Sequence, residues 1–213
     1  MLIKNHCNSQ MGGFALTTVA WIICCISIGL PQWHVWHFQD PVAFKATTAF
    51  VGMWRVCTFQ YDDNFSNIKI CHQYNYHDTF IPLDIRVTQQ LLLAASFLGL
   101  IGKVIIIISL WNVCRGRVRT NSIFNPFGLS GILNIIASSF LFLAVLFNYV
   151  SIILQEGIVF PRSFNVPSQP DTQEIGSAMA SAMTAAVFFL LSGTILLTSN
   201  FPADKPLRFK YSK

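Results

Sequence analysis

The sequence predicts an integral membrane protein, mainly α-helical, in which four transmembrane helices carry a β-rich segment outside the membrane. Four apolar stretches each reach the roughly 17 to 25 residues that a helix needs to cross about 30 Å of hydrocarbon. They are Gly12 to Leu30, Val87 to Trp111, Phe127 to Val150 and Ile175 to Ser199. Only 11% of the 213 residues are charged, whereas an ordinary soluble domain has roughly 25%. Little sequence remains outside the spans, so we expect a single domain over residues 1–213.

The basic residues predict the orientation of the chain. Eight of them lie before the first span, in the 112–126 interval and after the fourth span, namely Lys4, Arg115, Arg117, Arg119, Lys205, Arg208, Lys210 and Lys213. Basic residues are enriched on the cytoplasmic side of membrane proteins. We therefore expect both termini and residues 112–126 in the cytoplasm, and residues 31–86 and 151–174 outside the cell. The net charge of +5 then reflects orientation and attraction to membrane lipid, and we expect no nucleic-acid partner.

The first span has an alternative interpretation as a cleaved secretory signal, because Lys4 precedes it and Ser27 and Gly29 lie near its end. The apolar core of a signal peptide has roughly 7 to 15 residues, and this stretch is longer. We expect it to be retained as a helix.

The first outer segment contains two runs that are typical of strands, Lys45 to Phe59 and Asn67 to Asp78. The residues between them, Tyr61 to Ser66, favour a tight turn. Cys57 and Cys71 lie seven positions either side of Asn64, which places them opposite each other on an antiparallel hairpin. Because thiols oxidise outside the cell, we expect a disulfide, and the alternative is two unpaired buried thiols. Asn64 also begins an acceptor sequon for N-glycosylation.

Several short motifs now resemble one family. Trp33 after the first span, then Gly52, Met53 and Trp54, then Cys57 and Cys71, resemble the W, GLW, C, C pattern of the claudins, with Met53 where leucine is usual. The segment Ile81 to Ile85 resembles the family's LPxDL approach to the second span, and Glu174 to Gly176 resembles its ELG. The chain is similar to a divergent member of the family over nearly its whole length.

The resemblance implies a fold, a location and partners. It implies a left-handed four-helix bundle capped by an extracellular antiparallel sheet of about five strands. It also implies tight junctions of the plasma membrane as the location, with the chain itself and other claudins as partners in the same membrane and across the cell gap. The second outer interval resembles the family's short adhesive loop, with Phe160, Pro161, Phe164 and Pro167 as candidate contacts. These aromatic side chains alternatively fold down on top of the bundle.

Three features depart from the family. The interval between Cys57 and Cys71 is longer than usual, and Gln89 stands where the family has an arginine just inside the second span. The chain ends at Lys213, whereas a PDZ groove fits an apolar last side chain. We therefore do not expect PDZ scaffold binding through this tail.

Polar residues within the spans suggest a second candidate site. Lys103, Asn134 and Ser192 lie at a similar depth, counted from the cytoplasmic ends, and we hypothesise that they form an interhelical polar cluster. The alternative for Lys103 is a side chain that extends to the inner headgroups. Cys114 lies beside arginines at the end of the second span and is a candidate for palmitoylation.

The sequence does not indicate enzyme chemistry. It contains no paired nucleophile and base, no phosphate-binding glycine loop and no HExxH. The spacing of His34, His37, His72 and His77 matches no metal-ligand motif, so we expect no cofactor and no metal. We expect a structural adhesion protein. The alternatives are an auxiliary subunit that flanks a channel or receptor within one membrane, and a channel in its own right, which the lack of a continuous polar stripe disfavours.

Overall fold

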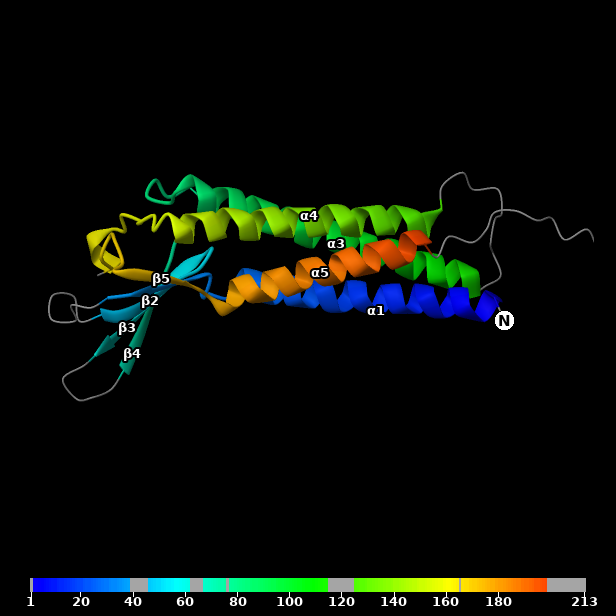
Figure 1. Cartoon of the computed structure of the whole chain (residues 1–213), viewed down its shortest axis with the longest axis horizontal. Coiled ribbons are helices and arrows are strands. Elements are labelled where there is room, and N and C mark those ends of the chain that lie inside the picture. Colours follow the sequence, from blue (N-terminus) through cyan, green and yellow to red (C-terminus); the bar gives the residue numbers. More distant parts are fainter. Residues whose placement is uncertain are drawn as a thin grey trace, which may run out of the picture.

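In the part of the chain that the structure describes, four long helices form one elongated bundle, with a β-sheet at one end of it (Figure 1). The structure, a computed structural model, describes residues 2–38, 46–61, 67–75, 77–114, 125–164 and 166–198. The helices are α1 (Leu2–Gly29), α3 (Leu83–Cys114), α4 (Pro126–Ile153) and α5 (Ser177–Thr198). Each is long and apolar enough to cross a membrane, which confirms the four expected spans.

Small residues bring α5 close to its neighbours. Ala178, Ala182 and Ala186 recur at a spacing of four and are all buried, and such spacing places them on one face of the helix. Small side chains let helix backbones approach closely in lipid, where no hydrophobic driving force acts between helices. The most extensive helix contacts are those of α3 with α4, of α1 with α5 and of α4 with α5, whereas α1 and α3 share a much smaller contact.

The sheet has five antiparallel strands, in agreement with the family resemblance. They are β1 (His34–His37), β2 (Ala46–Val51), β3 (Arg55–Tyr61), β4 (Asn67–Gln73) and β5 (Thr172–Ile175). Their order in the sheet is β4-β3-β2-β1-β5. The strand β5 therefore comes from the second interval of the chain and pairs with β1, with Ile175 opposite His34. Both outer segments thus build one sheet.

The expectation of a single strand from Lys45 to Phe59 is wrong. The run divides into β2 and β3, which pair with each other around a turn at Gly52, where the Gly52 amide donates to the Arg55 carbonyl at 2.9 Å. The residues on both sides of this turn favour strands equally. The strand pattern therefore does not indicate where one strand ends and the next begins. The second run also ends earlier than expected, at Gln73.

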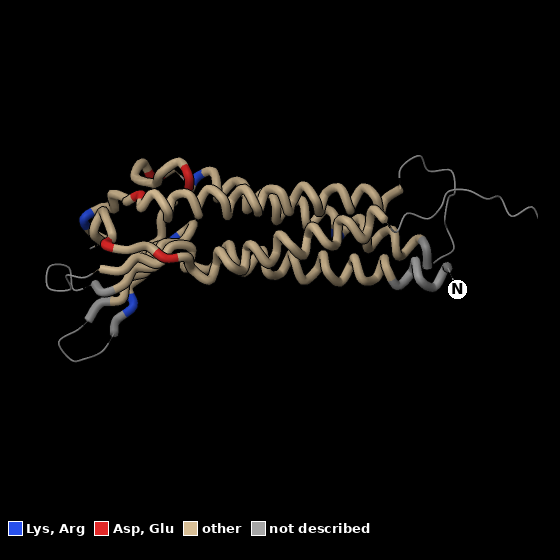
Figure 2. Tube along the Cα trace, in the orientation of Figure 1, with Lys and Arg blue, Asp and Glu red and all other residues tan. Residues whose placement is uncertain are grey.

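The inner face of the sheet packs on the end of the bundle. Trp33, Trp36, Val51, Met53 and Val56 are buried in the same hydrophobic core as residues of all four helices. Among the residues that the structure describes, the charged ones gather at this end, while the long helices are almost free of them (Figure 2). The sheet therefore forms a polar end on an apolar helix bundle.

Candidate functional site

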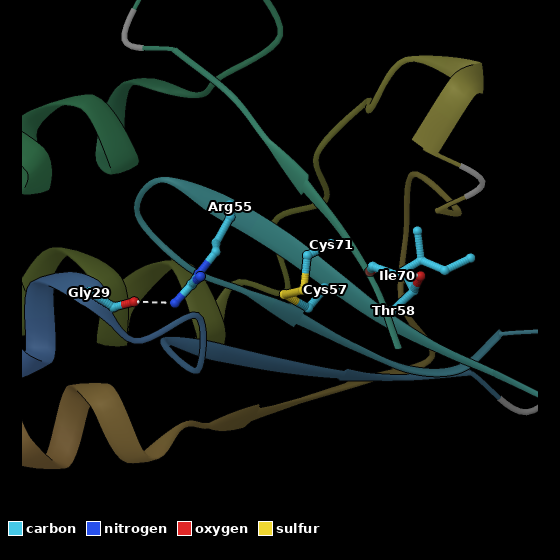
Figure 3. The surroundings of a disulfide bond; sticks show 6 residues. All are labelled: Gly29, Arg55, Cys57, Thr58, Ile70 and Cys71. Carbon is cyan, nitrogen blue, oxygen red and sulfur yellow. Dashed lines mark hydrogen bonds between the residues drawn. A yellow bond between two sulfur atoms is a disulfide. The ribbon is translucent and has the colours of Figure 1, made fainter. Parts of the chain in front are cut away.

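The expected disulfide joins the two outermost strands on one side of the sheet. Cys57 on β3 and Cys71 on β4 are directly paired in the strand register, with their Cα atoms 4.1 Å apart and their sulfur atoms bonded (Figure 3). This confirms the disulfide prediction. The bond closes a loop with a sequence separation of 14, and closing a loop of this length stabilises a fold by roughly 3 kcal/mol in the chain-entropy model.

The motif residues shared with the claudins connect the sheet to the bundle. The Trp33 indole is buried and donates to the Ser27 carbonyl of α1 at 2.9 Å. Nearby, the Arg55 guanidinium donates to the Gly29 carbonyl at the end of the same helix at 2.7 Å (Figure 3). The segment just before β1 and the strand β3 are therefore both hydrogen bonded to the end of α1.

Two side chains are hydrogen bonded to the turn between β2 and β3. The hydroxyl of Tyr74 donates to the Gly52 carbonyl, and the side-chain amide of Gln89 on α3 donates to the Met53 carbonyl at 2.5 Å. Both side chains are buried. Gln89 thus performs a structural task, since its amide fixes the turn to the second span.

A buried chain of hydrogen bonds connects β1, α4 and α3. The ring Nε2 of His34 lies 2.8 Å from Asn148 Oδ1, and Asn148 Nδ2 donates to Thr88 Oγ1 at 2.7 Å. Burial lowers the pKa of His34, and Asn148, Asp84 and Gln173 act in the opposite direction. Sequence reasoning missed Asn148 and Thr88. The only signal was a polar residue near the end of each span, which is common and points to no partner.

The second outer loop folds back on the sheet. Phe160 is 8% exposed and packs edge-on against Trp36, with ring centroids 5.8 Å apart. Phe164 stacks on His72 with ring centroids 4.5 Å apart. These two rings therefore pack on the sheet, which is the second of the two arrangements that the sequence leaves open for them, because burying an aromatic ring is more favourable than leaving it in water. The loop exposes Val159, Pro161 and Arg162 instead, while Pro167 is partly buried.

The structure joins two residues of the expected intramembrane cluster and separates the third. Asn134 Nδ2 lies 3.2 Å from Ser192 Oγ and 2.8 Å from Thr17 Oγ1. Thr17 and Ser192 are also 2.6 Å apart, so α1, α4 and α5 meet through these three side chains. Lys103 lies elsewhere, with its Nζ 3.8 Å from the centroid of the Trp21 ring. Thr17 was not anticipated, because hydroxyls on apolar helices usually bond to their own backbone.

The two candidate modification sites lie outside the described part of the chain or at its edge. Asn64 lies outside the described residues, and Cys114 is the last residue of α3 with a side chain outside the described part.

The comparisons with known proteins agree with this geometry. A sequence model of the family described as PMP-22/EMP/MP20/Claudin tight junction matches residues 18–198. Claudin-1 of Rattus norvegicus is 24% identical to the chain over 216 aligned positions, which cover 92% of this chain and 91% of the relative. Claudin-1 of Mus musculus matches with the same identity and coverage. The match runs from the middle of α1 to the end of α5, and the chain therefore belongs to the PMP-22/EMP/MP20/claudin family.

Proposed function

We propose that this protein is a structural adhesion protein of tight junctions in the plasma membrane. In this proposal it polymerises laterally with itself and other claudins, meets chains of the facing cell and forms or modulates a paracellular barrier. The sheet carries the proposal, because buried hydrogen bonds fix it to the bundle and a disulfide joins two of its strands, so that it presents a rigid surface above the membrane. Membership of the family supports a structural role rather than an enzymatic one.

Two surfaces suit these contacts. The strand β4 is at the edge of the sheet, and an edge strand offers unpaired backbone groups to a neighbouring chain. The loop after α4 presents Val159, a residue that is 73% exposed, beside the exposed Pro161 and Arg162. We assign lateral contacts to the sheet and contacts across the cell gap to the tip of this loop. Both termini then lie in the cytoplasm, on the side opposite the sheet.

Expression in fibroblasts that lack junctions tests the proposal. We expect enrichment at cell contacts and strands in freeze-fracture images. Val159→Asp is expected to reduce the enrichment, whereas Ser163→Asp, at another exposed position of the same loop, is the matched control. Surface biotinylation shows whether each variant reaches the plasma membrane. Diffuse staining of protein that has reached the surface would contradict the adhesion proposal.

An auxiliary subunit of a channel or receptor is the second candidate function. Lys103 favours it, because a cation within a membrane span is suited to pair with a second membrane protein. Diffuse surface staining in the fibroblasts, together with co-purification of one membrane protein, is the result expected for this alternative.

A further inference from the structure

Lys103 is the only charged residue in the four apolar stretches. Gly12 to Leu30, Phe127 to Val150 and Ile175 to Ser199 contain none, and Val87 to Trp111 contains Lys103 alone. Charged residues in spans are rare, and they usually pair with another group or mark a functional site. No carboxylate of this chain is available at the same depth, because the nearest on α3 is Asp84, 19 residues toward the sheet and roughly 28 Å away at about 1.5 Å per residue.

The Lys103 amine rests on an aromatic ring within the second span. Lys103 lies roughly 12 Å from Trp111 along α3 at about 1.5 Å per residue. Side chains on a helix lean toward its N-terminus, which for α3 is the sheet end. The Nζ rests 3.8 Å from the centroid of the Trp21 ring. This position disagrees with a lysine that extends to the nearer headgroups, because the aromatic ring holds the cation at depth.

The cation lies on the least extensive contact between neighbouring helices. The contact between α1 and α3 is smaller than those of the other three neighbouring pairs. We call the line of contact between α1 and α3 the α1/α3 seam. On the sheet side of Lys103, Trp21 Nε1 donates to the Ser96 carbonyl at 3.1 Å, so the two helices are in direct contact along that part of the seam. Lys103 itself is partly exposed, and Val104 and Ile107, which follow it on α3, are exposed. An apolar helix can therefore lie along this seam and reach the Lys103 amine.

We propose that the α1/α3 seam around Lys103 binds a transmembrane helix of another membrane protein that carries an aspartate or glutamate at the matching depth. Charge complementarity selects the occupant, since a carboxylate is the group that neutralises a lysine in hydrocarbon. A second copy of this chain does not supply that carboxylate. The site is therefore heteromeric and goes beyond lateral or adhesive contacts between claudins.

The test uses the full chain in phosphatidylcholine vesicles and three synthetic probe helices. Each probe is a polyleucine span with one polar residue: glutamate at the depth of Lys103, glutamine at the same depth, or glutamate near the opposite membrane surface. Association is measured by resonance energy transfer between labelled protein and labelled probe. We expect the depth-matched glutamate probe to bind about tenfold more tightly than the other two, the size expected for a polar contact between membrane helices.

Protein variants then assign the preference to the lysine. Lys103→Met is expected to bind the three probes alike, and Lys103→Arg is expected to keep the preference. Equal binding of the glutamate and glutamine probes by the unaltered protein overturns the proposal without any question of folding, because only the probe differs. A preference that persists in Lys103→Met overturns it as well.

A lipid occupant is the remaining outcome to distinguish. If spin-labelled phosphatidylserine is enriched around the unaltered protein but not around Lys103→Met, and the probes bind alike, the seam takes an anionic lipid and the proposal is wrong. The assay contains no facing membrane. Failure of the probe to bind therefore does not contradict the adhesion proposal. In the same way, diffuse staining in fibroblasts contradicts the adhesion proposal but not the proposed binding of a helix at Lys103.

Discussion

His34 on β1 and Asn148 on α4 share a hydrogen bond of 2.8 Å in a place where both side chains are buried. Asn148 uses its Nδ2 to donate to Thr88 Oγ1 and to the Ala144 carbonyl, so its Oδ1 is an acceptor. The ring Nε2 of His34 must therefore carry the proton. One imidazole thus connects the sheet to two helices.

The stability of the fold should fall in mild acid because of His34. Burial lowers the pKa of His34 below its usual 6.5 in the folded chain, so the folded state binds fewer protons than the unfolded state. The contribution of uncharged His34 is complete above pH 6.5 and is lost as the pH falls below it, by at most about 1.4 kcal/mol per pH unit. Thermal unfolding in detergent at pH 7.5 and pH 5.5 measures this.

A variant pair separates this effect from general acid destabilisation. His34→Gln is expected to reduce the difference in Tm between the two pH values. Gln89→Leu removes a different hydrogen bond between bundle and sheet, the one to the Met53 carbonyl, without removing a titratable group. It should lower Tm by the same amount at both pH values. An unchanged pH dependence in His34→Gln would show that other groups cause it.

Gly52 cannot accept a side chain. A Cβ atom added there would lie 2.6 Å from the Pro31 Cα, which is backbone and cannot move aside alone. We expect Gly52→Ala to lower the free energy of unfolding by about 1 to 3 kcal/mol, as for other overpacked sites. The matched control is Gly29→Ala, since a Cβ at Gly29 meets nothing within 4 Å. Equal Tm values for the two variants would contradict the close approach.

Removal of the disulfide should destabilise the sheet more than the bundle. Cys57→Ser with Cys71→Ser is expected to cost roughly 3 kcal/mol, because the unfolded chain regains the freedom of the closed loop. Loss of ordered strands, followed by hydrogen exchange of β3 and β4 amides, should precede loss of the helices. Cys25→Ser, at a partly buried cysteine of α1, is the control. Exchange that is unchanged in β3 and β4 would show that the strand pairing holds without the bond.

The four spans and the disulfide could be predicted because each depends on a property of a contiguous segment. Apolar length predicts a membrane helix wherever it occurs, and the symmetric spacing of Cys57 and Cys71 about a turn indicates their pairing. The packing of Phe160 and the partner of Lys103 depend on which segments meet in space. The sequence marks an aromatic or a cation at these positions but not the ring that lies opposite, which for Lys103 is 82 positions earlier at Trp21.

The ring of Phe160 should protect the loop after α4 from protease. Phe160 packs between Trp36 and Phe80, with centroids 5.8 and 5.9 Å away, and truncating a buried phenylalanine typically costs about 3 to 5 kcal/mol. We expect Phe160→Ala to increase the rate of tryptic cleavage after the exposed Arg162. Val159→Ala, next to it but exposed, should leave the rate unchanged. Equal cleavage of the two variants would show that the ring does not hold the loop.

Asn134 should matter for helix association within the membrane. Its amide lies between Thr17 and Ser192, and Ser192 Oγ also donates to the Gly13 carbonyl at 2.8 Å, so Asn134→Leu leaves hydroxyls of α1 and α5 without their donor. Hydrogen bonds between membrane helices contribute about 0.6 to 2 kcal/mol each, and we expect a loss of that order in the free energy of unfolding in detergent. Ser139→Ala is the matched control, because Ser139 is on the exposed face of α4 and donates only to its own helix, at the Ile135 carbonyl. If both variants unfold at the same denaturant concentration, the three-helix contact contributes no stability.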